Sequence, residues 1–314
     1  MNEFLTDVLN GLGKRQKSIP PRWFYDRVGS EIFEEITRLP EYYPTEAERE
    51  IFATQMSDIA GVVGQGKMVV EFGSGSSTKT PAVLIGTAAT TYVPIDISGE
   101  FLRESADAIA RDFPALAVHA IEGDFTHYIE LPQSRFGEGR IGFFPGSTIG
   151  NLDEDDAVAL LRQMHGSLGE GAVLLIGMDR SKSEQRLIPA YDDPQGVTAR
   201  FNLNLLRRIN AELGGTIDLS AFDHEVRWNT ERSRIEMHLR ARHAVEFTVD
   251  GQPFSLAEGE TIHTENSYKY TPGNAHALLR AGGWQPLKEW TDSAGLFSVF
   301  AAGRDEALKL PLQP

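Results

Sequence analysis

Residues 143–151, FFPGSTIGN, carry groups that can hold a ligand but cannot readily take a proton from it. Gly146 offers a backbone amide without a side chain, Thr148 a hydroxyl and Asn151 a carboxamide. The stretch contains no acid, base or thiol. Amides and hydroxyls orient a substrate by donating and accepting hydrogen bonds. The residue types therefore predict binding and alignment here rather than acid–base catalysis.

A glycine-rich turn follows an earlier apolar run, the first of five in chain order, in VVEFGSGSST. Gly73 and Gly75 let the backbone turn tightly and approach a ligand closely. Asp96 ends the next apolar run, TTYVPID, about 20 residues further on, where an acid meets ribose hydroxyls in nucleotide-binding sheets. Thr78 replaces the third glycine of the dinucleotide fingerprint, which disfavours a pyrophosphate. The turn predicts a nucleoside without phosphates.

A third apolar run ends in GDF, where Asp124 and Phe125 suit the amino group and the face of an adenine. Among nucleoside cofactors without phosphates, S-adenosylmethionine is the commonest, and we predict it here. The alternative is that Asp96 and Asp124 cap helices or lie in solvated loops.

A β-sheet is needed to bring the ends of these apolar runs together. Five apolar runs alternate with helix-like segments between residues 67 and 187, which predicts a parallel α/β sheet. Apolar residues at helical spacing precede it, and Thr45 with Glu48 fits a capping box. From about residue 188, a helix and alternating strands with an Asp250-Gly251 turn predict antiparallel hairpins. The last helix and two strands return to the sheet. The expected division is 1–60 and 188–272 as a substrate domain, and 61–187 and 273–314 as a Rossmann-like cofactor domain.

Composition narrows the function further. The 314 residues are 41% hydrophobic with a net charge of −15, which disfavours nucleic acid as a partner. The absence of cysteine excludes disulfides and thiolate chemistry and suits a cytoplasmic location. No run approaches the length of a membrane span, and the first residues do not read as a secretory signal. We expect a monomer. The eight histidines lack metal-ligand spacing, so His238, His243 and His263 are predicted to be structural or surface residues, and no metal is predicted.

Five motifs together resemble the histidine-specific S-adenosylmethionine-dependent methyltransferases. They are EFGSGSSTKT, FFPGSTIGN, AYDDPQGVTARFNLNLLRRIN, RIEMHL and TENSYKY. The resemblance runs from about residue 15 to 303 and implies a class I methyltransferase sheet with a second α+β domain. It also implies trimethylation of the α-amino group of free L-histidine to hercynine, the first step of ergothioneine biosynthesis.

The resemblance assigns roles to particular residues. The cofactor site would contain Tyr25, Gly73, Lys79, Asp96, Asp124 and Phe125. The substrate carboxylate would contact Asn151 and Tyr191, with Tyr42 nearby. The substrate amine would lie near Gly146 and Thr148. The imidazole would be held by Glu265 and Ser267, with Met237 in the same pocket. This set agrees with the opening observation, because an amine brings its own nucleophile and a sulfonium is already a good leaving group. Alignment alone can then supply about 7–11 kcal/mol at best.

Each assignment has a plainer alternative. Glu265 and Ser267 are two apart, so on a strand they face one way and can bracket an imidazole, or simply lie solvated on a sheet face. Asn151 can cap the helix starting near Asp153. Tyr191 can pack in a loop, and Met237 can belong to the core. Of Tyr42 and Tyr43, one is expected to face the site and the other to pack outward.

Two rival functions remain open. One is the same chemistry on another free aromatic amino acid, tryptophan or tyrosine. The other is a non-catalytic module that binds S-adenosylmethionine. A protein or RNA methyltransferase is disfavoured, because the surface is acidic and the insertion suits a small ligand.

Overall fold

The computed structural model describes residues 2–75, 79–133 and 139–304. Contacts among Cα atoms divide the chain into two compact units. Unit 1 comprises Met1–Tyr42 and Lys182–Tyr268, and unit 2 comprises Tyr43–Ser181 and Lys269–Pro314. Residues 43–60, which the sequence-based division groups with the N-terminal helices, belong to unit 2, because helix α3 packs on the large sheet. The assignment of the two units to cofactor and substrate stays a prediction.

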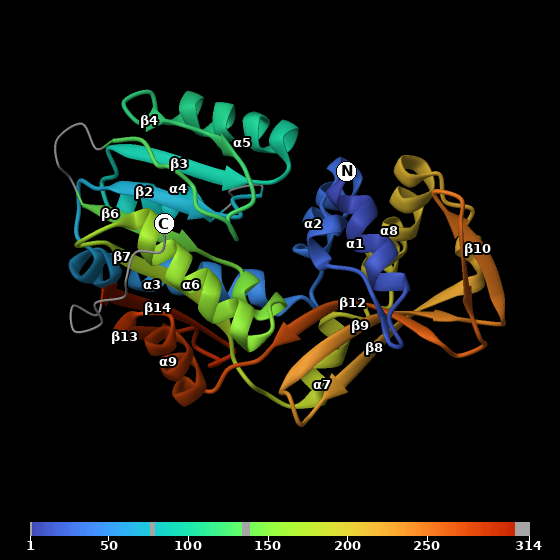
Figure 1. The fold of residues 1–314 in the computed structure, drawn as a ribbon. Helices are drawn as coiled ribbons and strands as arrows, with labels where there is room; N and C mark the ends of the chain where they lie inside the picture. The colour runs from blue at the N-terminus through green and yellow to red at the C-terminus, as the bar shows by residue number, and fades with distance from the viewer. Residues whose placement is uncertain (1, 76–78, 134–138, 305–314) are drawn as a thin grey trace. The chain divides into compact units, whose positions relative to one another are not determined.

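Unit 2 is built on an eight-stranded sheet with the order β13-β14-β7-β6-β2-β3-β4, with β5 also paired to β3 (Figure 1). Strands β2 to β7 run parallel to one another, whereas β14 is antiparallel to both β7 and β13. The strands are β2 (Met68–Phe72), β3 (Thr91–Asp96), β4 (Ala117–Val118), β5 (Ile121–Glu122), β6 (Arg140–Phe144), β7 (Val173–Asp179), β13 (Trp284–Thr291) and β14 (Phe297–Arg304). The predicted α/β sheet and the return of the C-terminal segment to it are confirmed.

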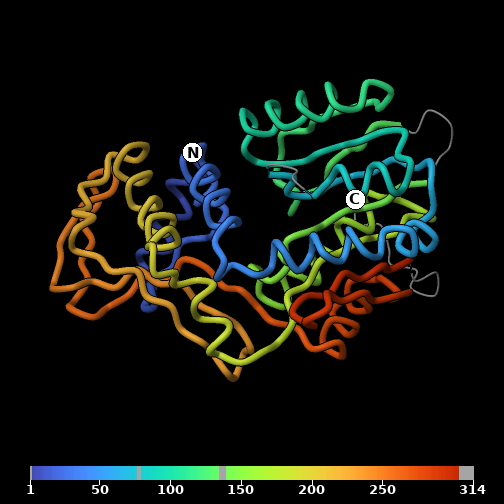
Figure 2. The backbone as a smooth tube through the Cα atoms, turned by 180° about the vertical axis from the view of Figure 1, so that it is seen from behind, coloured from blue at the N-terminus to red at the C-terminus, as the bar shows by residue number. Residues whose placement is uncertain are grey.

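Helices cover both faces of this sheet, because alternate residues of a strand point to opposite sides. Met68, Val70 and Phe72 of β2 belong to one apolar cluster, which also includes residues of α6 and α9. Val69 belongs to the other cluster, with residues of α3, α4 and α5. Figure 2 shows α3 running alongside the sheet. The helices are α3 (Tyr43–Val63), α4 (Thr80–Gly86), α5 (Gly99–Asp112), α6 (Glu154–Leu168) and α9 (Pro272–Ala281), with the 3-10 helix η2 (Thr148–Asn151).

Unit 1 contains a four-stranded sheet with the order β1-β12-β9-β8 and a separate hairpin, β10-β11. The strands are β1 (Lys17–Ser18), β8 (Phe222–Asn229), β9 (Arg234–Ala241), β10 (Val245–Val249), β11 (Gln252–Leu256) and β12 (Thr261–Tyr268). The α-helices are α1 (Glu3–Leu12), α2 (Arg27–Ile36), α7 (Glu184–Leu187) and α8 (Val197–Leu213). Short 3-10 helices are η1 (Pro21–Phe24), η3 (Ile188–Ala190) and η4 (Leu219–Ala221).

Local sequence explains much of unit 1. The predicted Asp250-Gly251 turn joins β10 to β11, with positive φ at both residues (48° and 74°), as a two-residue hairpin loop requires. Helix α8 occupies the predicted amphipathic segment and buries Phe201, Leu205 and Ile209 along one stripe.

The capping box predicted for Thr45 and Glu48 is wrong. Helix α3 begins at Tyr43, so Thr45 already lies inside its first turn. The Glu48 carboxylate accepts hydrogen bonds from Gly146, 98 residues away, instead of closing a local cap. Long-range burial therefore outweighs the local pattern here.

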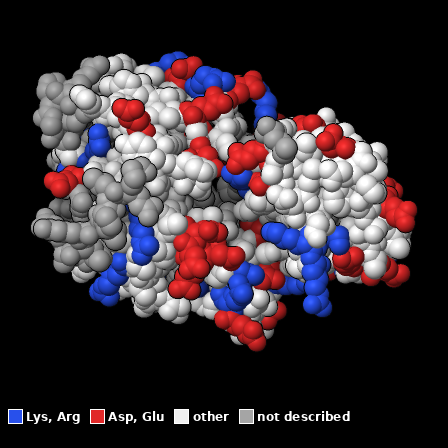
Figure 3. Space-filling view, in the orientation of Figure 1, with Lys and Arg blue, Asp and Glu red and all other residues white. Residues whose placement is uncertain are grey.

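Among the helices within residues 2–75, 79–133 and 139–304, none is long and apolar enough to cross a membrane. On the face drawn in Figure 3, acidic and basic side chains are interspersed. This agrees with a chain that carries 45 acidic residues against 30 lysines and arginines.

Candidate functional site

Two strand ends of unit 2 are tied together by Asp96. Because β2 and β3 are parallel neighbours, their carboxyl ends meet at the same edge of the sheet. The Gly75 amide donates to Asp96 Oδ2 at 3.0 Å, and the Ser98 amide donates to Oδ1 at 2.9 Å. Burial raises the pKa of Asp96, and these amide hydrogen bonds partly offset the rise. The structure thus joins Asp96 to the predicted glycine-rich turn; Ser76, Ser77 and Thr78 of that turn lie outside the described residues.

Gly73 and Phe125 meet at this edge. Gly73 has a φ of +69°, and a Cβ placed on it would lie 3.2 Å from the Phe125 ring. The Phe125 ring packs edge-on against Phe144, with centroids 5.7 Å apart. A glycine is favoured here both by the backbone conformation and by the close ring. Two predicted cofactor residues are therefore neighbours.

Asp124 takes part in a local turn. Its Oδ1 accepts from the amide of Thr126 at 2.9 Å and from the hydroxyl of Thr126 at 2.6 Å. The loop role named as an alternative is thus present in the structure. The cofactor role of Asp124 stays a prediction.

Tyr25 lies in unit 1, unlike the other predicted cofactor residues. Its ring packs edge-on against Phe33 and Phe201, each with a centroid separation of 5.7 Å. Its role toward the cofactor also stays a prediction.

Lys79 meets the loop that follows β6. Its ammonium forms an ion pair with the carboxylate of Glu48, which is completely buried. Both oxygens of Glu48 accept from the Gly146 amide, at 3.1 and 3.0 Å. Lys79 Nζ lies 3.7 Å from the position that a Cβ on Gly146 would take. The structure therefore brings together one residue predicted for the cofactor and one predicted for the substrate amine.

The loop after β6 has an unusual backbone. Gly146 and Ser147 have positive φ values of 76° and 58° in succession. Ser147 Oγ accepts from the Asp179 amide at 2.9 Å, and the Thr148 hydroxyl donates to the Pro145 carbonyl at 3.2 Å. A left-handed serine costs free energy and persists where its surroundings hold it. This loop is therefore pre-shaped by the protein.

Asn151 ends η2 and is half-buried. Helix α6 begins at Glu154 with Asp153 as its N-cap residue. The alternative that Asn151 caps this helix is therefore wrong, because η2 places it two residues too early.

A buried ion pair is linked to the same loop through Asp179, whose amide donates to Ser147. Lys269 Nζ lies 2.8 Å from Asp179 Oδ2, and the two side chains are 0% and 1% exposed. The Tyr43 hydroxyl donates to the same oxygen at 2.7 Å. The expectation that one of the two adjacent tyrosines packs outward is wrong, since Tyr43 is buried in unit 2 and Tyr42 is half-buried in unit 1.

The residues predicted for the imidazole lie on one face of the unit 1 sheet. Glu265 and Ser267 of β12 are 8% and 5% exposed, and Glu265 pairs directly with Met237 of β9. Tyr191 Oη is 2.7 Å from Ser267 Oγ, and Tyr42 packs edge-on against Tyr191 at 6.3 Å between centroids. The alternative of two solvated residues on an open sheet face is wrong. Met237, 2% exposed, is a core residue that also neighbours Glu265.

A bulge in β12 decides which residues share that face. The pairing with β9 shifts between His263 and Glu265. His263 pairs with His238, whereas Glu265 pairs with Met237 on the opposite side of the strand. Thr264, at the shift, donates its hydroxyl to Asn202 Oδ1 at 2.8 Å. Sequence reasoning had no signal for this bulge.

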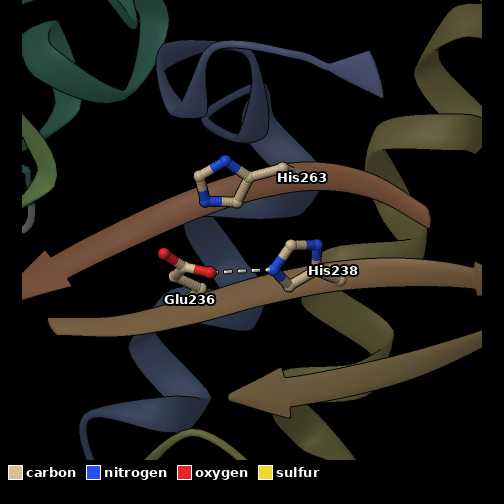
Figure 4. A group of neighbouring side chains, drawn as sticks. All are labelled: Glu236, His238 and His263. Carbon is tan, nitrogen blue, oxygen red and sulfur yellow. Dashed lines mark hydrogen bonds and ion pairs between the residues drawn. The ribbon is translucent and has the colours of Figure 1, made fainter. Parts of the chain in front are cut away.

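The other face of these strands carries Glu236, His238 and His263, whose candidate ligand atoms lie within 4.8 Å of one another (Figure 4). The imidazole rings stack, with centroids 4.8 Å apart and an interplanar angle of 23°. Zinc needs donors at about 2.0–2.2 Å from one point, so these side chains would have to turn to bind it. Arg234 already pairs with Glu236 at 2.7 Å. We interpret the cluster as structural.

The charges of this cluster are unusual. Burial acts to raise the pKa of Glu236, but hydrogen bonds from Arg234 and Asn229 outweigh it and lower that pKa to about 2. Burial, with repulsion from His263 and Arg227, lowers the pKa of His238 to about 4. At neutral pH the cluster therefore holds a carboxylate beside an uncharged imidazole of His238.

Glu71 is a further buried acid, on β2. It accepts hydrogen bonds from Thr80 Oγ1 at 2.7 Å and Tyr92 Oη at 2.5 Å. Burial raises its pKa to about 7 despite these hydrogen bonds and nearby Lys79. Its side chain points to the same face as that of Val69, toward the cluster that contains α3 and α4.

Sequence reasoning did not assign a role at the site to Glu48, Asp179 or Lys269. Glu48 was recognisable in one respect: it stands three and four residues before Ile51 and Phe52, on the apolar side of its helix. Asp179 was recognisable as an acid that ends the fifth apolar run. Their partners could not be read from spacing.

The model of the histidine-specific, S-adenosylmethionine-dependent methyltransferases matches residues 4–304. The histidine N-alpha-methyltransferase of Mycobacterium tuberculosis is 42% identical over 95% of this chain and 94% of that protein. Ergothioneine biosynthesis protein 1 of Neurospora crassa is 27% identical over 89% of this chain and 32% of its own length. The L-tryptophan methyltransferase of Psilocybe serbica is 25% identical over 94% of this chain and 91% of that protein. The chain belongs to the family of histidine-specific, S-adenosylmethionine-dependent methyltransferases.

Proposed function

We propose that this protein is a cytoplasmic enzyme, acting as a monomer, that trimethylates the α-amino group of free L-histidine to hercynine for ergothioneine biosynthesis. The observation that carries the histidine assignment is the pair of buried residues Glu265 and Ser267 on one strand face. A carboxylate and a hydroxyl can together satisfy both nitrogens of an imidazole. The names of the M. tuberculosis and N. crassa relatives agree with this substrate and pathway.

Unit 2 supplies groups that fit S-adenosylmethionine. Asp96 is proposed to hold the ribose hydroxyls, Phe125 and Asp124 the adenine, and Lys79 the carboxylate of the methionine part. Gly73, with its positive φ and no side chain, is proposed to let the backbone approach the ligand closely at the strand end. Tyr25 of unit 1 is proposed as a further cofactor contact.

When bound, S-adenosylmethionine supplies an electrophilic methyl group on a positively charged sulfur. Each transfer would require an uncharged amine, so the substrate would release one proton to solvent before each of the three transfers, and the sulfur would keep the electron pair of the broken S–C bond. Gly146, Thr148 and Asn151 are proposed to align the amine and carboxylate, with Tyr191 and Tyr42 also contributing. The small residues at 146 and 148 are suited to an amine that grows with each transfer.

Mass spectrometry tests this proposal directly. Purified protein is incubated with S-adenosylmethionine and an equimolar mixture of the twenty amino acids. We expect histidine to gain three methyl groups and other amino acids none. Label on tryptophan or tyrosine would support the rival substrate class. The P. serbica relative is named an L-tryptophan methyltransferase. Cofactor binding without any methylated product would support the non-catalytic rival.

A further inference from the structure

Glu48 on α3 is completely buried and joins two loops of unit 2. Its two carboxylate oxygens share one hydrogen bond from the Gly146 N–H, at 3.1 and 3.0 Å, and the carboxylate pairs with Lys79 Nζ. Gly146 follows β6, whereas Lys79 precedes α4. One side chain from a third element therefore links both.

The sheet leaves a space that this carboxylate fills. Gly177 lies on β7, and a Cβ built there would be 2.2 Å from Glu48 Oε1. An ordinary side chain at that position would displace the carboxylate. The carboxylate therefore sits where β7 carries no side chain, beneath the Gly146 amide.

Charge explains why an acid stands here. An ionised carboxylate removed from water needs compensation by an opposite charge and by hydrogen bonds. Lys79, whose side chain is 14% exposed, provides the charge, and the Gly146 amide provides the shared hydrogen bond. In return, the carboxylate limits where the Lys79 ammonium and the Gly146 backbone can lie.

We infer that Glu48 is a positioning residue for methyl transfer, which holds Lys79 and the Gly146 loop at a set distance from each other. This inference rests on the proposed function, in which Lys79 binds the cofactor and Gly146 lies at the amine. Because in-line transfer depends on sub-ångström alignment, loosening this link lowers turnover more than it weakens histidine binding.

Glu48→Gln is the sharpest substitution. It keeps the size and one acceptor oxygen, but it removes the negative charge and places an NH₂ group against either Lys79 or the Gly146 amide. We expect kcat to fall about 10- to 100-fold and the Kd for S-adenosylmethionine to rise about tenfold, with the KM for histidine within about twofold of wild type. Glu46→Gln, the same change on an exposed position of the same helix, is the matched control.

The measurements are steady-state rates with each substrate varied, and calorimetric titration of the cofactor. Thermal unfolding verifies that the variants are folded. Kinetics of Glu48→Gln equal to those of Glu46→Gln, or activity lost only in proportion to the unfolded fraction, would overturn the inference. If Glu48→Gln does not fold, Glu48→Asp keeps the charge and shortens the reach; wild-type kcat in that variant would equally overturn it. If the wild type methylates no histidine, the proposed function fails. The calorimetric titration of S-adenosylmethionine still tests whether Glu48 positions Lys79 for the cofactor.

Discussion

The candidate site residues of the two units are held in different ways. In unit 2 they lie at strand ends, where backbone amides, positive φ angles and buried ion pairs determine the geometry. In unit 1 they lie along strands, where Glu265 and Ser267 share a buried face and a bulge puts His263 on the opposite face. The contrast indicates that unit 2 depends on the positions of common groups, whereas unit 1 depends on the identity of particular side chains. Substitutions in the two units should therefore fail differently.

Glu265→Ala is expected to have the largest effect. A site that hydrogen-bonds a polar group of its substrate can discriminate against other substrates by up to about 10⁴–10⁵. Because the variant lacks the carboxylate that would bind the imidazole, we expect kcat/KM for histidine to fall about 10³-fold or more. Cofactor affinity should change less than twofold. Competition between histidine and other amino acids, read by mass spectrometry, provides the measurement. Unchanged discrimination would remove the basis of the histidine assignment.

Lys269→Met tests whether buried charge supports the strand ends of unit 2. It leaves Asp179, 1% exposed, without its cation, and breaking such a pair costs about 3–5 kcal/mol. Urea denaturation measures the free energy of unfolding. The double variant Lys269→Met with Asp179→Asn should recover much of this loss. A loss below about 1 kcal/mol would show that the pair is not important for stability.

Glu71→Gln separates charge from hydrogen bonding within unit 2. The folded-state pKa of Glu71 is about 7, above the ordinary value of 4.5. Wild type therefore loses stability as the pH rises from about 4.5 to about 7, and the loss is complete above that range. Glutamine still accepts hydrogen bonds from Thr80 and Tyr92 and does not ionise.

We expect the free energy of unfolding of the variant, relative to that of wild type, to rise by about 2–3 kcal/mol from pH 5 to pH 8, measured by urea denaturation at both pH values. Glu50→Gln is the matched control, because hydrogen bonds from Ser293 lower the pKa of Glu50. An equal difference at both pH values would contradict the raised pKa of Glu71.

Asp96→Asn should have a smaller and selective effect. Asparagine retains the shape of the side chain but presents an NH₂ group to the amide of Gly75 or of Ser98. In the wild type both amides donate to the Asp96 carboxylate. We expect the Kd for S-adenosylmethionine to rise about tenfold, with little change in histidine discrimination. Calorimetric titration measures the first and amino-acid competition the second. A change in discrimination instead would erase the distinction between the units.

Metal removal should have the smallest effect. Dialysis against EDTA is expected to change kcat less than twofold, because the Glu236, His238 and His263 cluster is interpreted as structural. Activity that disappears with EDTA and returns with zinc would contradict this, and loss of the zinc effect in His238→Asn would locate the ion.

Much of the architecture was predictable because its causes are local. The largely apolar run of β2, the amphipathic stripe of α8 and the Asp250-Gly251 turn each follow from residues close together in the chain. The family motifs, which are continuous stretches of sequence, likewise indicate Gly146 and Glu265 as candidate site residues, and spacing from the glycine-rich turn indicates Asp96. The predicted capping box is wrong because helix α3 begins before Thr45, and the Glu48 carboxylate accepts from the distant Gly146 amide instead.

The sequence by itself determined the alternation of strands and helices, the glycines at strand ends and the residue types offered to ligands. The tertiary structure alone decided that Glu48 meets Gly146, that Asp179 meets Lys269, and that a bulge separates His263 from Glu265. The physical reason is range. Periodicity and turn preferences act between near neighbours, whereas a buried charge takes whichever partner the packed fold brings to it.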